Sequence, residues 1–302
     1  MSIPLFDCHC DTIVEAAAAN AHLRSNSLQL DLERLSRYSP CAQVFAVCTE
    51  IEHEPQAPAE QMLMRLNSEL CANGDIVRLC LTADDIDLAT AEGKIAAFIS
   101  VEGAEQLTTL ERAYSLGVRC IHPTWNFDNH YCGAALAGGG GLTDAGRDLV
   151  MRAQEIGILL DMSHISEAGF YDVVAISRKP VIAGHSNSAA VMRHKRNLTD
   201  TQFTELVKCG GGAGVNLYPD FLGGGKNIAS VVSHIEHFLS LGGRHSVFLG
   251  CDFDGVDSLP GGITGVQDLE KLYCELLRRN FSEDCVRDIF WNNLYNIFRR
   301  AL

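Results

Sequence analysis

Eight short runs of β-branched and aliphatic residues recur along the chain and constrain its fold more than any other feature. Most intervals between the runs leave room for a helix, which is the pattern of βα units around a parallel sheet. Eight such units in about 250 residues predict an α/β fold, the (β/α)8 TIM barrel. The runs lie at 3–8, 43–48, 95–101, 118–122, 157–162, 180–184, 211–217 and 246–251.

Apolar residues recur at helical spacing in several of the intervals. This spacing occurs at 30–35, 60–73 and 142–156, and again at 282–298, where Ser282 is a suitable N-cap for a closing helix packed on the barrel wall. Glycine-rich stretches at 138–141 and 223–225 follow predicted strands and are expected to form mobile loops. Because no linker rich in proline or serine divides the chain, we expect one domain over residues 1–302.

Charge and composition exclude several classes of partner. With 24 basic and 38 acidic residues the net charge is −14, which argues against nucleic acid or an anionic membrane. No apolar stretch approaches the roughly 20 residues that cross a bilayer, and no basic leader precedes the first strand. The twelve cysteines, without a CxxC pair, are expected to be reduced thiols. We therefore expect a cytoplasmic protein.

Side chains that can bind a metal stand where five of the predicted strands end. In a (β/α)8 barrel these positions meet at one rim, where uncompensated buried charges would carry a large free-energy cost. Cations at this rim would remove that cost. The residues are His9, Asp11, Glu102, His164, His185 and Asp252.

Six nitrogen and oxygen ligands exceed the need of one tetrahedral zinc ion, which indicates two zinc ions that share a ligand. Glu102 is the natural bridge, because a carboxylate has two oxygens and a neutral imidazole cannot link two ions. Two ions that clamp a hydroxide and polarise a carbonyl are suited to hydrolysis of an amide or ester. Asp252 is the best-placed group to move the proton.

A second group of histidines lies in the C-terminal third of the chain. His234 and His237 lie three residues apart with Glu236 between them on a predicted helix. Such a stripe is usually a solvent-exposed helix face, and we expect that here.

The order of short motifs along the chain resembles that of membrane (renal-type) dipeptidases, the M19 metallopeptidases. The resemblance spans nearly the whole chain. Its motifs are Asp-x-His-x-Asp at 7–11, Val-Glu-Gly at 101–103, Gly-Val-Arg at 117–119, Gly-Leu-Thr with Gly at 141–146, Leu-Asp-Met-Ser-His at 160–164, Pro-Val-Ile-x-x-His-Ser at 180–186, Arg-Asn at 196–197, Val-Asn-x-Tyr at 215–218 and Gly-x-Asp-Phe-Asp-Gly at 250–255.

The resemblance implies a binuclear zinc TIM barrel that hydrolyses dipeptides, often with a D-residue at the C-terminal side, and that forms a homodimer. By position, His9 and Asp11 would hold one zinc ion and His164 and His185 the other, with Glu102 bridging. The expected partner is a small dipeptide, with neither nucleic acid nor membrane.

The resemblance also assigns the residues around the metals. Asp252 matches the acid/base, Arg196 matches the residue that binds the substrate carboxylate, and Tyr218 matches a pocket tyrosine. An arginine suits this task because its guanidinium pairs with a carboxylate through two parallel hydrogen bonds.

One position departs from the renal type. Where those members carry a histidine thought to help bind the reacting carbonyl, this chain has Trp125, followed by Asn126, and both are expected to contact substrate. His122 and His130 are near in sequence but displaced. The departure leaves open a catalytically silent dipeptide-binding homologue.

Another metal-dependent amide hydrolase, acting on N-acyl amino acids or cyclic amides, is a further alternative. Barrels of that kind commonly open with His-x-His and often use a bridging lysine, whereas this chain has His9-x-Asp11 and Glu102. The dipeptidase is therefore the favoured function.

Overall fold

Nine parallel strands form the centre of the computed structural model, which describes residues 2–48 and 56–302. The sheet order is β2-β1-β9-β8-β7-β6-β5-β4-β3, and pairing of β2 with β4 closes eight of the strands into a barrel. This confirms the predicted (β/α)8 fold. The strands are β1 Leu5–Cys10, β2 Cys41–Val47, β3 Val77–Leu79, β4 Ile95–Glu102, β5 Val118–His122, β6 Leu159–Asp161, β7 Val181–Ala183, β8 Gly212–Val215 and β9 Val247–Leu249.

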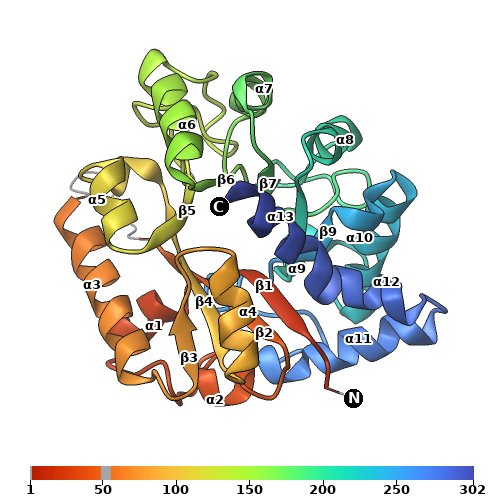
Figure 1. Cartoon of the computed structure of the whole chain (residues 1–302). Coiled ribbons are helices and arrows are strands. Elements are labelled where there is room, and N and C mark those ends of the chain that lie inside the picture. Colours follow the sequence, from red (N-terminus) through yellow and green to blue (C-terminus); the bar gives the residue numbers. More distant parts are fainter. Residues whose placement is uncertain (1, 49–55) are drawn as a thin grey trace.

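Helices surround the barrel as an outer ring (Figure 1). The predicted helix at 142–156 forms as α6, with Thr143 as a side-chain N-cap and Gly157 in the left-handed conformation at the C-cap. The helices are α1 Thr12–Ala18, α2 Leu32–Leu35, α3 Gln56–Ala72, α4 Asp84–Ala91, α5 Leu110–Ser115, α6 Asp144–Ile156, α7 Glu167–Ile176, α8 Asp200–Lys208, α9 Pro219–Leu222, α10 Ile228–Ser240, α11 Leu269–Arg278, α12 Glu283–Arg287 and α13 Asn293–Ala301, with a π-helical turn, η4, at Asp288–Asn292.

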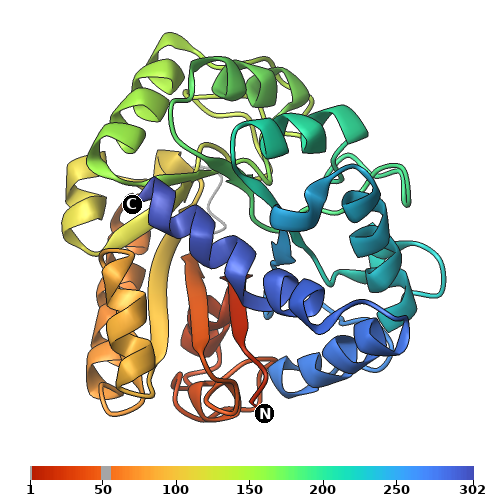
Figure 2. The same cartoon turned by 45° about the vertical axis from the view of Figure 1, so that its right-hand side comes forward.

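The C-terminal helix closes one end of the barrel instead of lying on its wall. In Figures 1 and 2 α13 runs across the middle of the ring. The Phe298 ring packs 5.0 Å from that of Phe6 and 4.6 Å from that of Phe98, between centroids. These three side chains are fully buried. Because aromatic side chains fill the interior at this end, the other end is left for a cleft.

Strand β1 does not keep a strict alternation of faces. Its register with β2 shifts between Asp7 and Cys10. Cys8 joins Phe6 in the barrel interior, whereas Cys10 packs in the layer between strands and helices. Strict alternation along this strand would place both Cys8 and Cys10 on the face opposite His9, and Cys8 departs from it. The shift places consecutive side chains, Cys8 and His9, toward the barrel centre.

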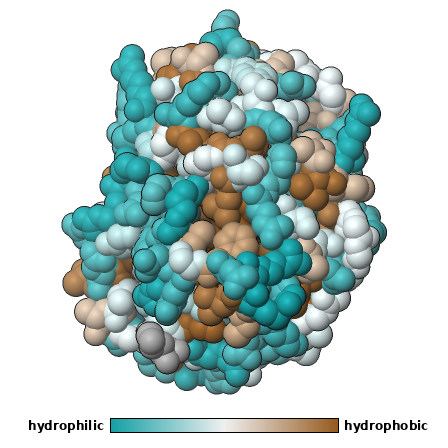
Figure 3. Space-filling model, turned by 90° about the vertical axis from the view of Figure 1, so that its right-hand side faces the viewer, coloured by the Kyte–Doolittle hydropathy of each residue, from teal (hydrophilic) through white to brown (hydrophobic). Residues whose placement is uncertain are grey.

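The surface carries few large exposed hydrophobic residues. On the face shown in Figure 3 hydrophobic side chains appear in separate patches among hydrophilic ones. Within the described ranges, none of the helices has the length and apolar character to cross a bilayer. The single domain, the homodimer and the cytoplasmic location stay predictions.

Candidate metal centre

The predicted site residues meet in a cleft of about 1170 Å³ beyond the carboxyl ends of the strands. In parallel barrels this is the face on which loops carry active sites. His9 is buried among the residues that line it. Those residues include Asp11, Glu102, Trp125, Asn126, His164, His185, Arg196, Tyr218 and Asp252.

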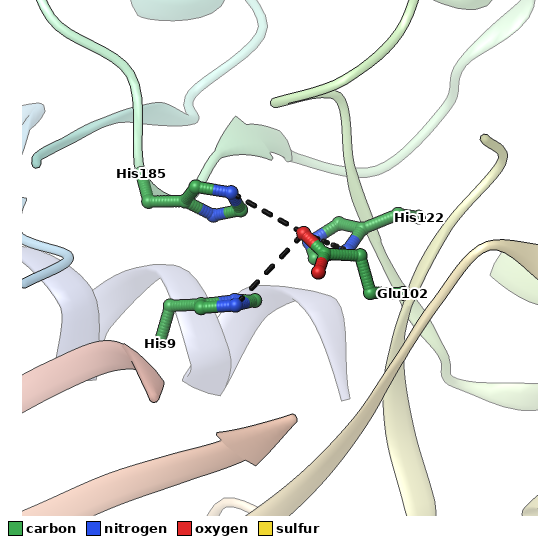
Figure 4. Close-up of side chains that lie close together, drawn as sticks. All are labelled: His9, Glu102, His122 and His185. Atoms are coloured by element: carbon green, nitrogen blue, oxygen red, sulfur yellow. Dashed lines mark ion pairs between the residues drawn. The ribbon is translucent and has the colours of Figure 1, made fainter. Parts of the chain in front are cut away.

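Glu102 is the centre of the cluster. It is the last residue of β4 and is buried, and four imidazoles approach its Oε1 atom. Figure 4 shows three of them converging on the carboxylate from different strands. The distances from Oε1 are 2.7 Å to His164 Nε2, 3.3 Å to His185 Nε2, 3.5 Å to His122 Nδ1 and 3.9 Å to His9 Nε2. A carboxylate in this position can bridge two ions.

A second group lies on the other side of His9. The His9 Nε2 atom is 3.2 Å from Asp11 Oδ2 and 3.8 Å from Asp252 Oδ1. Asp252 adopts a φ of +63°, and its backbone N–H donates to the His9 carbonyl at 3.1 Å. The backbone of the loop after β9 therefore holds the Asp252 carboxylate against β1.

Polar residues behind the cluster orient two of its members. The Nδ1 atom of His164 lies 2.9 Å from Asn126 Oδ1, which favours a proton on Nδ1 and leaves the Nε2 lone pair toward Glu102. Asn216 Nδ2 donates to Asp252 Oδ2 at 2.7 Å. Such partners fix the tautomer and rotamer of metal-binding side chains. The substrate-binding role expected for Asn126 stays a prediction.

Buried polar atoms without hydrogen-bond partners indicate that the cluster is suited to bind a cation. Among the described residues, His9 Nδ1, Asp11 Oδ1, Glu102 Oε1 and His185 Nδ1 are buried without a hydrogen-bond partner of good geometry. Two overlapping sets have ligand atoms within 4.8 Å of one another. The sets are His9, Glu102, His122 and His185, and His9, Asp11 and Asp252. Nitrogen and carboxylate donors of this kind suit zinc.

Neighbouring groups of the cluster shift one another's pKa in opposite directions. Burial lowers the pKa of His9, but the carboxylates of Asp11 and Glu102 outweigh it and raise the pKa to about 10. Burial, with the nearby Arg196 guanidinium, lowers the pKa of His164 to about 4. Burial raises the pKa of Asp252 to about 7 despite His9. The cluster therefore titrates as a unit, and a bound cation competes with its protons.

Arg196 is a buried cation at the edge of the cluster. Its Nη2 atom lies 2.9 Å from His164 Nε2, and Nη1 lies 3.5 Å from Ser186 Oγ. Within the described residues no carboxylate is in ion-pair range of its guanidinium. Burial lowers the pKa of Arg196, although the carboxylates of Glu102, Asp252 and Asp161 act in the opposite direction. An anion that enters the cleft would supply the missing partner.

Two buried histidines were not assigned by the sequence prediction. His122, the last residue of β5, lies within the cluster, and its only signal in the sequence was its place at a strand end. His234 contradicts the expected solvent-exposed stripe, because it is fully buried on α10. Its Nδ1 accepts from Ser188 N and its Nε2 faces Leu222 O, so it links the loops after β7 and β8.

Imidazoles and carboxylates at the carboxyl face of a closed parallel barrel define a metal-binding TIM barrel. The chain belongs to the membrane dipeptidase family, peptidase family M19, whose model matches residues 1–301. Among curated proteins, it is 31% identical to an uncharacterized protein in the pqqA 5′ region of Klebsiella pneumoniae, over 80% of this chain and 95% of that protein.

It is also 31% identical to an uncharacterized dipeptidase of Schizosaccharomyces pombe, over 76% of this chain and 58% of that protein. Among solved structures, a metallopeptidase from Rhodobacter sphaeroides, liganded with a phosphinate mimic of the dipeptide L-Ala-D-Ala, superposes with a TM-score of 0.91. That pair is 28% identical and the match covers 100% of both chains.

Proposed function

We propose that this protein hydrolyses dipeptides with two zinc ions, bridged by Glu102 and a hydroxide, and that it accepts a D-residue at the C-terminal position. The observation that carries the proposal is the pair of overlapping ligand sets beside the buried Arg196. Family membership and the dipeptide mimic in the Rhodobacter sphaeroides structure support the substrate class.

Each zinc ion has a set of residues that would hold it. His9 and Asp11 would bind one ion and His164 and His185 the other, with Glu102 between them. When bound, the ions supply a hydroxide nucleophile at neutral pH and polarise the peptide carbonyl.

Residues of the chain position the dipeptide and move the proton. Arg196 binds the C-terminal carboxylate through its guanidinium, which fixes the distance from that carboxylate to the peptide bond. Asp252, held by Asn216, accepts a proton from the nucleophile at a carboxylate oxygen and delivers it to the leaving amine. Trp125 and Tyr218 line the cleft and would exclude water from the bound dipeptide.

The test combines metal analysis with a substrate panel. Purified protein should contain about two zinc ions per chain and hydrolyse L,L- or L,D-dipeptides, and a chelator should abolish turnover. Faster turnover of N-acyl amino acids or cyclic amides would instead identify the alternative amide hydrolase. Dipeptide binding without turnover in the zinc-loaded protein would identify a silent homologue.

The acid/base assignment has its own variant. Asp252→Asn should lower kcat by about 10²-fold or more, the usual contribution of a positioned acid/base, while zinc content stays unchanged. Asp148→Asn, at an exposed position on α6, is the matched control and should keep full activity. Loss of zinc from Asp252→Asn would show that Asp252 is a metal ligand.

A further inference from the structure

His122 is a buried imidazole inside the metal cluster for which the family resemblance gives no role. It ends β5 and has no exposed surface. Its Nδ1 atom lies 3.5 Å from Glu102 Oε1, and its Nε2 atom lies 2.9 Å from Asp161 Oδ2. The ring therefore stands between the proposed bridging carboxylate and a second carboxylate deeper in the barrel, as Figure 4 shows for the Glu102 side.

Asp161 determines which ring nitrogen carries the proton. Its Oδ1 atom accepts from Ser163 N and Gly184 N, both at 2.9 Å, and from the Ser163 hydroxyl at 2.5 Å. The Oδ2 atom is left to face His122 Nε2. A carboxylate beside one ring nitrogen favours the tautomer with the proton on that nitrogen. The lone pair of His122 is therefore on Nδ1, which points toward Glu102.

In this tautomer, the lone pairs of His122 Nδ1 and Glu102 Oε1 face each other without a proton between them. Among the described residues, Glu102 Oε1 and both ring nitrogens of His122 lack a hydrogen bond of good geometry, although Nε2 lies 2.9 Å from Asp161 Oδ2. Leaving a buried polar atom without a partner destabilises the folded state. His122 belongs to the four-residue set whose ligand atoms all lie within 4.8 Å of one another. A cation among these atoms would satisfy both lone pairs.

We propose that His122 is a further protein ligand of the metal centre, binding through Nδ1 the ion held between Glu102 and His185. Asp161 is its positioning partner, in the carboxylate–histidine–metal arrangement that fixes ligand tautomers. The inference rests on the proposed metal centre and adds a sixth residue to the five ligands expected from the sequence.

The experiment measures zinc directly. Zinc content is measured by elemental analysis, and zinc affinity by competition with a chromophoric chelator, in wild type, His122→Ala, His122→Asn and Asp161→Asn. His122→Ala and His122→Asn should each lose about one zinc ion per chain. Asp161→Asn should keep two ions and bind one of them about 10- to 100-fold more weakly, the usual effect of removing a partner of a metal ligand.

Control variants separate the possible outcomes. His185→Ala should also lose an ion, and His130→Ala, at an exposed position on the loop after β5, should bind zinc as wild type does. Circular dichroism and thermal unfolding with zinc in excess confirm that each variant is folded. His122→Ala removes every ligand atom of the side chain, so full zinc binding by this variant would overturn the ligand role.

The result also distinguishes this inference from the proposed function. If wild type binds two ions and His122→Ala binds two with equal affinity, only the His122 inference fails. If wild type binds no zinc, the proposed zinc dipeptidase fails first.

Discussion

At the scale of single residues, Arg196 is a buried cation beside the cluster, without a carboxylate in ion-pair range among the described residues. Arg196→Ala should raise KM for free dipeptides by roughly tenfold or more, since about 1.4 kcal/mol of lost binding corresponds to one decade. Arg196→Lys should restore only part of the loss, because an ammonium lacks the planar fork of the guanidinium. Steady-state kinetics checks both. An unchanged KM would remove Arg196 from the substrate site.

A nearby exposed arginine serves as control for that variant. Arg193 lies three residues before Arg196 on the same loop, so Arg193→Ala removes the same charge without touching the buried position. Its KM should equal that of wild type. A similar rise in both variants would indicate a long-range charge effect on the anionic substrate instead of direct binding.

Gly255 makes room for the two aspartates of the site. A Cβ atom at this position would overlap Asp11 Oδ2 and lie 2.5 Å from Asp252 Oδ1. Gly255→Ala should therefore displace both carboxylates and weaken zinc binding by about tenfold or more, because ligands must sit within about 0.5 Å of their productive geometry. Zinc competition measurements check this.

The control lies six residues further along. At Gly261 the nearest heavy atom to an added Cβ would be 3.6 Å away, an ordinary contact. Gly261→Ala should leave zinc affinity unchanged and shift the free energy of unfolding by no more than about 0.5 kcal/mol. Equal zinc affinity in Gly255→Ala and wild type would contradict the packing argument.

The sequence predicted most of the residues that meet at the site, because parallel strands bring their carboxyl ends to one rim. It could not show that His122 faces the centre, since the side-chain direction at a strand end depends on pairing with both neighbouring strands. His234 was misjudged for a related reason. Helical spacing gives the faces of α10, but the loops after β7 and β8 decide which face is covered.

At the scale of elements, α13 is the part of the fold whose role differs most from its sequence pattern. An amphipathic helix was expected on the outside wall, and α13 instead closes the barrel interior. The amphipathic pattern of α13 predicts that one face of the helix is buried, but it does not predict which part of the barrel covers that face. Strand β3, Val77–Leu79, was not among the predicted strands.

The closing helix can be tested through Phe298, which packs on Phe6 and Phe98. Phe298→Ala should lower the free energy of unfolding by about 3–5 kcal/mol, the usual cost of a large core cavity. Zinc content of the folded protein should stay unchanged, because the metal cluster lies at the opposite end. Denaturant unfolding and elemental analysis measure the two quantities.

Leu277→Ala on α11 is the control, because that side chain is 38% exposed. This variant should change the free energy of unfolding by no more than about 0.5 kcal/mol. If Phe298→Ala lowered the free energy of unfolding by less than about 1 kcal/mol, the packing of α13 on the barrel end would not contribute to stability as expected.

At the scale of the whole molecule, the metal centre links strands that are far apart in the sequence. Glu102, His185 and His9 come from β4, the end of β7 and β1. A ligand present at 1,000 times its Kd stabilises the folded state by about 4 kcal/mol. Removal of zinc should therefore lower Tm by roughly 8 °C, taking about 2 °C per kcal/mol for a chain of this size.

Differential scanning calorimetry before and after chelation checks this shift. Added zinc should restore the original Tm, whereas added magnesium should not, because magnesium prefers an all-oxygen octahedral shell. A Tm that does not respond to the chelator would mean that the cluster is held together without metal.

The closure of one barrel end by α13 also has a consequence for turnover. With aromatic side chains filling that end, the cleft beyond the carboxyl ends of the strands is the route by which a dipeptide would arrive and both amino acids would leave. If Arg196 binds the C-terminal carboxylate as proposed, the amino acid that retains this carboxylate keeps that contact and should depart last. Product release, and competitive inhibition by that amino acid, would then limit the rate of turnover at high product concentration.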